Sequence, residues 1–188
     1  MTASADLIQL INKKDPKALK QLFDEAYPKF SAIAMRYAKN AAQAEQLLHQ
    51  GLMHCFTSAQ HHRHLRAVDF DAYLESEFIL SCIQSIKDIR NEYYVSSTVH
   101  ATENQTGVYN LFDNQEWTDL NQVSTDVLIL SLQQLVPSQR LVFNLHVVDG
   151  KSLNDAANFL ESSIETVKSN LEKARYHLQK NIEKNLKK

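Results

Sequence analysis

The C-terminal part of the chain contains two apolar periodicities separated by a short polar interval. Apolar residues recur with helical spacing over Leu153–Leu160, and a second apolar face with the same spacing covers Ile164–Leu178. Residues 161–163 between them leave room only for a tight turn. Ser163 is suited to cap the second helix, because its hydroxyl can accept a hydrogen bond from an amide of the first turn. The pattern therefore predicts a helix-turn-helix.

The exposed face of the second helix has the composition of a surface that contacts DNA. Small polar side chains gather at its N-terminus, where recognition helices meet base edges and phosphates. Cations that can neutralise phosphates follow along the helix. The residues that we expect to contact DNA are Ser162, Ser163, Glu165, Thr166, Lys168, Ser169, Lys173 and Arg175. A helical hairpin with a solvated charged face would show the same pattern, and periodicity alone does not separate the two interpretations.

Residues 1–95 have helical periodicity over most of their length. We expect a short amphipathic helix over residues 5–12. A second helix should begin at Asp15 and Pro16, because an aspartate followed by a proline is typical of a helix start. Pro28 should kink or divide this helix, because proline lacks the N–H that an intrahelical hydrogen bond requires.

Two further helices are predicted in this half of the chain. Asn40 can cap the first of them, whose apolar seam extends over residues 44–56 and should pack against the preceding helix as an antiparallel pair. A polar connection follows over residues 57–69, and a last helix is predicted over residues 70–90. Together these elements predict an N-terminal helical bundle.

Charge is distributed unevenly along the chain. Residues 96–126 contain five acidic residues and no Lys or Arg, which predicts a flexible acidic linker. Residues 127–188 carry a net charge of +3, so the basic excess falls on the helix-turn-helix, as phosphate contact requires. Within this part, Ser138 should cap the helix that follows Pro137, and Gly150 should close it.

Composition supports an all-α protein. The 188 residues include only three Gly and three Pro, and 44% are hydrophobic. We therefore expect two helical domains, an N-terminal bundle over residues 1–95 and a C-terminal helix-turn-helix domain over residues 127–188, joined by the acidic linker over residues 96–126. No apolar run is long enough for a membrane span, and the N-terminus lacks the pattern of a secretory signal. Cys55 and Cys82 are expected to be buried free thiols of a cytoplasmic protein.

No catalytic motif is present in the sequence. There is no Gly-rich phosphate loop, no Cys-x-x-Cys pair and no Gly-x-Ser-x-Gly, so we expect neither an enzyme nor a cofactor. A group of histidines suggests a metal site, but it lacks the i, i+4 pairing with a carboxylate that would hold a cation. We therefore interpret it as solvated and expect no metal. The histidines are His49, His54, His61, His62 and His64.

Two blocks of the C-terminal part resemble region 4 of sigma-70-type factors, and the extracytoplasmic-function class in particular. The first block is LVPSQRLVF over residues 135–143, and the second combines DGKSL at residues 149–153 with TVKS at residues 166–169. The family's turn usually carries a Gly where this chain has Glu161. Because a non-Gly residue at positive φ costs about 1 kcal/mol, we expect a differently shaped turn.

The N-terminal half resembles region 2 of the same family, with departures. In the family, the helix after Asn40 docks on a coiled coil of core RNA polymerase, and the next helix opens the minus-10 DNA. The acidic D-A-E-D of the family becomes QAEQ at residues 43–46, and the D-x-x-R that closes the last helix has no clean counterpart. We therefore expect polymerase docking to be kept and do not expect DNA opening by the usual residues. The resemblance implies polymerase contacts by Glu45, Leu48, His49, Leu52 and Phe56.

The resemblance implies a sigma-like transcription initiation factor that binds core RNA polymerase and directs it to promoter DNA. An anti-sigma factor is a further partner that such a protein can have. The departures in the N-terminal half favour an alternative, a helix-turn-helix regulator that does not serve polymerase as its specificity subunit. A third interpretation is an interaction module that binds neither DNA nor polymerase.

Overall fold

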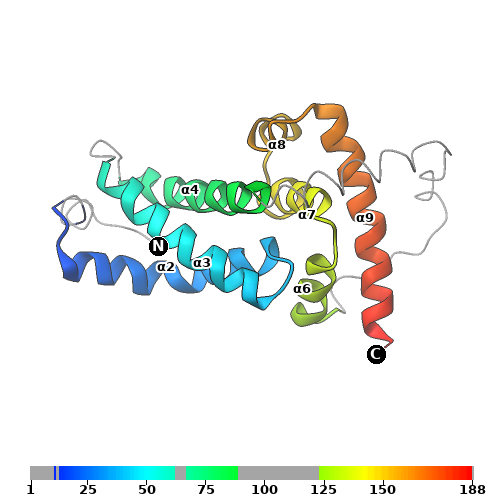
Figure 1. The fold of residues 1–188 in the computed structure, drawn as a ribbon, viewed down its shortest axis with the longest axis horizontal. Helices are drawn as coiled ribbons and strands as arrows, with labels where there is room; N and C mark the ends of the chain where they lie inside the picture. Colours follow the sequence, from blue (N-terminus) through cyan, green and yellow to red (C-terminus); the bar gives the residue numbers. More distant parts are fainter. Residues whose placement is uncertain (1–10, 12, 62–66, 89–122, 188) are drawn as a thin grey trace. The chain divides into compact units, whose positions relative to one another are not determined.

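The computed structural model describes residues 11, 13–61, 67–88 and 123–187. Every regular element among them is helical, which confirms the all-α prediction (Figure 1). None of the described helices is long and apolar enough to cross a membrane. The helix predicted over residues 5–12 lies outside the described residues except for Ile11, and the linker predicted over residues 96–126 lies outside them up to residue 122.

The chain divides into two compact units, Met1–Ser85 and Ile86–Lys188, and each is described by itself. The first contains α2 (Pro16–Tyr37), α3 (Ala41–His61) and most of α4 (Ala67–Asp88). The second contains α6 (Thr125–Gln133), α7 (Pro137–Phe143), the π-helical turn η3 (Asn144–Val148), α8 (Leu153–Leu160) and α9 (Ile164–Leu186).

Helix α2 begins as the sequence predicts. The Asp15 carboxylate accepts hydrogen bonds from the amides of Lys17 and Ala18, at 3.0 and 2.9 Å, and Pro16 occupies the first turn. Pro28 lies inside the helix and does not divide it. The helix continues through this position because Ala26 and Phe30 on either side of the proline are buried in the core.

Helices α2 and α3 pack as the predicted antiparallel pair. The Asn40 side chain accepts a hydrogen bond from the Gln43 amide at 2.9 Å and so caps α3, as predicted. Phe23, near the start of α2, lies beside Phe56, near the end of α3, with ring centroids 6.3 Å apart. Helix α3 extends to His61, so residues 57–61 are helical and the prediction of a connection there is wrong.

A glycine lets α4 approach α3 closely. A Cβ added at Gly51, in the middle of α3, would lie 2.4 Å from the Cε2 atom of Phe78 on α4. The Phe78 ring is fully buried and stacks on Phe30 of α2, with centroids 4.4 Å apart. Gly51 costs about 1 kcal/mol of helix propensity relative to Ala, and the close packing of three helices on this aromatic pair explains its presence.

Arg140 joins α6 to α7 in the second unit. Its side chain is 1% exposed and donates hydrogen bonds to the carbonyl oxygens of Leu135 and Gln133, at 2.6 and 3.2 Å, at the end of α6. Pro137 occupies the first turn of α7 and Val136 is its N-cap. The prediction that Ser138 caps this helix is therefore wrong, because Pro137 already lies inside the first turn.

Candidate functional site

Side-chain caps fix the start of both helices of the helix-turn-helix. Ser152 and Asp155 form a capping box on α8, in which the Asp155 amide donates to the Ser152 hydroxyl at 3.0 Å and the Ser152 amide donates to the carboxylate at 3.2 Å. The Ser152 hydroxyl, and then its amide, lower the pKa of the Asp155 carboxyl. On α9 the Ser163 hydroxyl accepts from the Thr166 amide at 3.1 Å, which confirms Ser163 as the N-cap.

The turn between α8 and α9 has the left-handed conformation that favours glycine. Glu161 has φ 51° and ψ 48°, so the expectation of a differently shaped turn is wrong. The Ser162 amide donates to the Ala157 carbonyl at 3.0 Å, and the Glu161 amide donates to that of Asn158 at 3.2 Å. This is the hydrogen-bond pattern of a Schellman motif, which satisfies carbonyls at the end of α8 and offsets the strain at Glu161.

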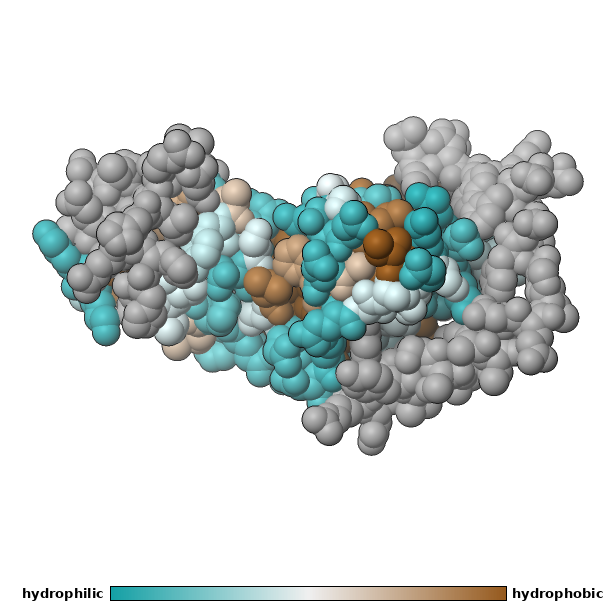
Figure 2. All heavy atoms as spheres, turned by 90° about the horizontal axis from the view of Figure 1, so that it is seen from above, coloured by the Kyte–Doolittle hydropathy of each residue, from teal (hydrophilic) through white to brown (hydrophobic). Residues whose placement is uncertain are grey.

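The predicted apolar faces of the two helices are buried as expected. Ala156, Ala157 and Leu160 of α8 are at most 5% exposed. Val167, Leu171 and Ala174 of α9 are at most 6% exposed. Because this stripe is buried, the opposite side of α9 faces outward. Figure 2 shows the hydrophilic and hydrophobic residues on one face of the molecule.

Most of the residues predicted to contact DNA lie at the surface. Ser162 and Ser169 are half-buried. Lys173 is the exception, because it is only 5% exposed. A phosphate contact requires an accessible ammonium group, so we do not include Lys173 in the candidate DNA surface. The exposed members are Ser163, Glu165, Thr166, Lys168 and Arg175.

The candidate DNA surface carries charges of both signs. Lys168 and Arg175 are seven residues apart and therefore lie on the same side of α9, two turns from each other. Glu165 lies in the first turn of the helix, where the helix dipole favours an anion. A hydrogen bond from its own backbone amide, and then one from the Ser163 hydroxyl, lower the pKa of the Glu165 carboxyl. The surface therefore presents two cations and one ionised acceptor.

The predicted polymerase-contacting residues are divided between the core and the surface of the first unit. Leu48 and Leu52 are 9% and 5% exposed, so they belong to the core and a partner does not meet them directly. Glu45 and His49 are exposed, and Phe56 is half-buried. The apolar seam of α3 is therefore the packing face of the bundle.

Sequence reasoning missed a group of exposed apolar side chains next to Phe56. Phe23 is 37% exposed, Tyr27 is 44% exposed, and their ring centroids are 5.4 Å apart. Met53 on α3 is 55% exposed and lies one turn before Phe56. We call Phe23, Tyr27, Met53 and Phe56 the aromatic cluster. The sequence signal that could have identified this group is the pair Phe23 and Tyr27, which are four residues apart on α2. Each lies one residue after a position of the helix that is buried in the core.

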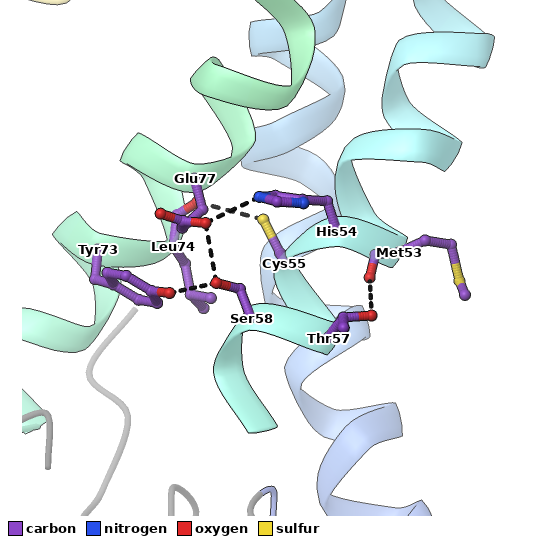
Figure 3. A network of polar contacts seen from close by, with 8 residues as sticks. All are labelled: Met53, His54, Cys55, Thr57, Ser58, Tyr73, Leu74 and Glu77. Carbon is purple, nitrogen blue, oxygen red and sulfur yellow. Dashed lines mark hydrogen bonds and ion pairs between the residues drawn. The ribbon is translucent and has the colours of Figure 1, made fainter. Parts of the chain in front are cut away.

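A polar network joins α3 to α4 in the first unit (Figure 3). The Glu77 carboxylate contacts His54 Nε2 at 2.9 Å and accepts a hydrogen bond from the Ser58 hydroxyl at 2.9 Å, and Ser58 also bonds the Tyr73 hydroxyl. The carboxylate lies between the serine and the histidine, so the imidazole cannot take the serine proton as it does in a catalytic triad. The network is therefore a structural tie between the helices.

Two groups next to this network have raised pKa values. Burial, and then the nearby Glu77 carboxylate, raise the pKa of the Cys55 thiol to about 12, and the thiol donates to the Leu74 carbonyl at 3.4 Å. Burial also raises the pKa of Tyr73. The predicted burial of the free thiols is confirmed for Cys55 and Cys82. Within the described ranges no three His, Cys, Asp or Glu residues lie close enough to hold a metal ion, and two of the clustered histidines, residues 62 and 64, lie outside them.

Comparison with protein families gives a match that covers the helix-turn-helix. No curated protein matches the chain. Residues 125–178 match the family model described as Sigma-70, region 4. The match extends from the start of α6 to Leu178 in α9 and includes the buried Arg140, both capped helices and the turn at Glu161. This segment is therefore similar to sigma-70 region 4, a DNA-binding helix-turn-helix of transcription initiation.

Proposed function

We propose that the chain is a sigma-like transcription initiation factor of the extracytoplasmic-function class. It binds core RNA polymerase in the cytoplasm and directs it to promoters by placing the N-terminal half of α9 in the major groove at the minus-35 element. The observation that supports this most directly is the exposed face of α9 within a capped helix-turn-helix that matches sigma-70 region 4. The function is one of binding and positioning, with no covalent step.

The exposed residues of α9 divide the recognition of DNA between them. Lys168 and Arg175 neutralise phosphates, and each such contact contributes about 0.9 to the slope of log affinity against log salt. The Glu165 carboxylate repels phosphate and gains only from donors, such as the exocyclic amines of cytosine and adenine in the major groove. Thr166, exposed in the same turn, offers a hydroxyl and a methyl group to base edges.

The aromatic cluster is our candidate for the polymerase-docking surface of the first unit. Large aromatic side chains that are partly exposed and close to one another are typical of the residues that dominate protein–protein binding energy. Glu45 and His49 are exposed on α3, the helix that also carries Met53 and Phe56. They supply polar groups for the rim of the proposed interface. The proposed contact set therefore keeps Glu45, His49 and Phe56, and replaces the buried Leu48 and Leu52 by Phe23, Tyr27 and Met53.

The alternative function is a helix-turn-helix regulator that acts without joining the polymerase. The observation that favours it is that the family match, at residues 125–178, lies wholly within the second unit. Transcription in vitro separates the two functions. A sigma-like factor gives promoter-specific transcripts when the full chain and core polymerase are the only proteins present. A regulator gives none under these conditions, although it binds the same DNA.

A further inference from the structure

Three exposed polar side chains at the start of α9 are linked to one another. The Ser163 hydroxyl accepts a hydrogen bond from the Thr166 amide at 3.1 Å and lies 3.0 Å from the Thr166 hydroxyl. A hydrogen bond from its own amide, and then one from the Ser163 hydroxyl, hold the pKa of the Glu165 carboxyl below its ordinary value. Glu165 is therefore ionised at neutral pH and is held at the exposed surface of the helix.

The ionised carboxylate sets the direction of the hydrogen bonds in this group. A hydroxyl group has one proton to donate, and hydrogen bonds to a charged acceptor are the stronger ones. The Ser163 proton therefore goes to Glu165, so in the contact between the two hydroxyls Thr166 is the donor. Because both hydroxyl protons are used within the group, the side-chain oxygens of Ser163, Glu165 and Thr166 offer only lone pairs to a DNA groove.

A surface of acceptors distinguishes between bases in the major groove. The donors there are the N4 amine of cytosine and the N6 amine of adenine, whereas guanine and thymine present the acceptors O6 and O4. Adenine also presents N7, an acceptor that repels a carboxylate, next to its amine. Cytosine has no acceptor on its major-groove edge, so it is the base that suits an ionised carboxylate best.

We propose that Glu165 is a specificity-determining residue that selects a cytosine at one position of the site read by α9. This role rests on the proposed function and adds a base preference to it. The carboxylate gains a hydrogen bond where a cytosine amine meets it, and elsewhere it is repelled by phosphates and by acceptors on the bases. Lys168, exposed three residues later on the same helix, supplies a phosphate contact that offsets this repulsion.

The test is the selection of a site from a library of random DNA duplexes. Core polymerase is used alone, with the full wild-type chain, and with the full chain carrying Glu165→Gln, whose amide both donates and accepts and so suits N6 and N7 of adenine. Glu172→Gln is the matched control, because Glu172 is exposed on α9 two turns later and its replacement removes the same charge. Far-UV circular dichroism checks that each variant folds.

We expect the wild type and Glu172→Gln to enrich cytosine at one position, and Glu165→Gln to lose this preference in favour of adenine. A direct binding measurement on the selected duplex gives the size of the effect. Replacing that cytosine by thymine should weaken the binding of the wild-type chain roughly tenfold, and that of Glu165→Ala by less than about twofold.

Two results would contradict the role of Glu165 in different ways. If Glu165→Gln keeps every base preference of the wild type, or if the position that it alters prefers a base other than cytosine, this role is overturned. The proposed function then stands, because the chain still directs polymerase to a selected sequence. If adding the chain to core polymerase enriches no sequence, the proposed function is overturned, and the role of Glu165 with it.

Discussion

The replacement of Gly51 by alanine tests the account of the first unit, because two effects of opposite sign meet at this residue. Alanine is favoured over glycine inside a helix by about 1 kcal/mol. The added Cβ, however, would lie 2.4, 2.6 and 3.1 Å from three atoms of the Phe78 ring. That ring is fully buried and stacked on Phe30, so any shift of the ring disturbs the packing of the core.

The steric cost of the contact between the added Cβ and the Phe78 ring should exceed the gain in helix propensity. Overpacking a well-filled core costs about 1–3 kcal/mol, and the short Cβ distances place this site near the upper end. After the gain in helix propensity is subtracted, Gly51→Ala should destabilise the first unit by roughly 2 kcal/mol, which lowers its folding constant on the order of 30-fold. Hydrogen–deuterium exchange of the α3 amides in the full chain measures this, because their opening equilibrium should rise by the same factor.

Two further variants separate packing from other effects. Gln46→Ala, at an exposed position of α3, should change stability by less than about 0.5 kcal/mol. In a Phe78→Leu background, Gly51→Ala should cost less than in the wild type, because the residue that the Cβ meets is smaller. A Gly51→Ala protein that is more stable than wild type by about 1 kcal/mol would show that helix propensity alone decides, and would refute the packing argument.

Three other predictions concern the second unit and the partners. Lys168→Ala should weaken binding to a selected promoter and reduce the salt slope by about 0.9, whereas Lys184→Ala, exposed near the end of α9, should leave both unchanged; equal effects in a fluorescence titration would count against the α9 surface. Tyr27→Ala should raise the dissociation constant for core polymerase at least tenfold without affecting DNA binding, and an unchanged constant would exclude the aromatic cluster. Because the folded-state pKa of Asp155 is lowered below its ordinary value of 3.8, its contribution to stability is present above that pH and is lost as the pH falls through the folded-state pKa; Ser152→Ala should therefore flatten the decline of the second unit's stability below about pH 4 in acid titrations followed by circular dichroism.

Local signals in the sequence predicted the helix starts well, because a cap depends on a few neighbouring residues. Asp15, Asn40 and Ser163 each accept the expected hydrogen bond from the first turn of a helix. Ser138 failed as a predicted cap because the proline before it already occupies the first turn of α7. Glu161 shows the limit of the local argument, since backbone hydrogen bonds at the end of α8 hold it in a left-handed conformation that its own preference disfavours.

The surface of the first unit was harder to predict, because exposure depends on how three helices pack. The spacing of Leu48 and Leu52 fits an apolar surface that binds a partner as well as one that packs into the core. In the structure both side chains are buried in the core. Phe23 and Tyr27 lie one residue away from the core positions Leu22 and Ala26 on α2, so their exposure follows from the rotation of that helix. Nothing in the helical pattern indicated that Lys173 would be buried.

The measurement that tests the central claim most directly is size-exclusion chromatography of core RNA polymerase, the full chain and a labelled duplex that carries a selected site. If the chain is a sigma-like factor, the DNA elutes with the polymerase only when the chain is present, and Lys168→Ala reduces this co-elution. A chain that binds the duplex in the absence of polymerase but never elutes with the core enzyme would contradict the proposed sigma-like function and establish the regulator in its place.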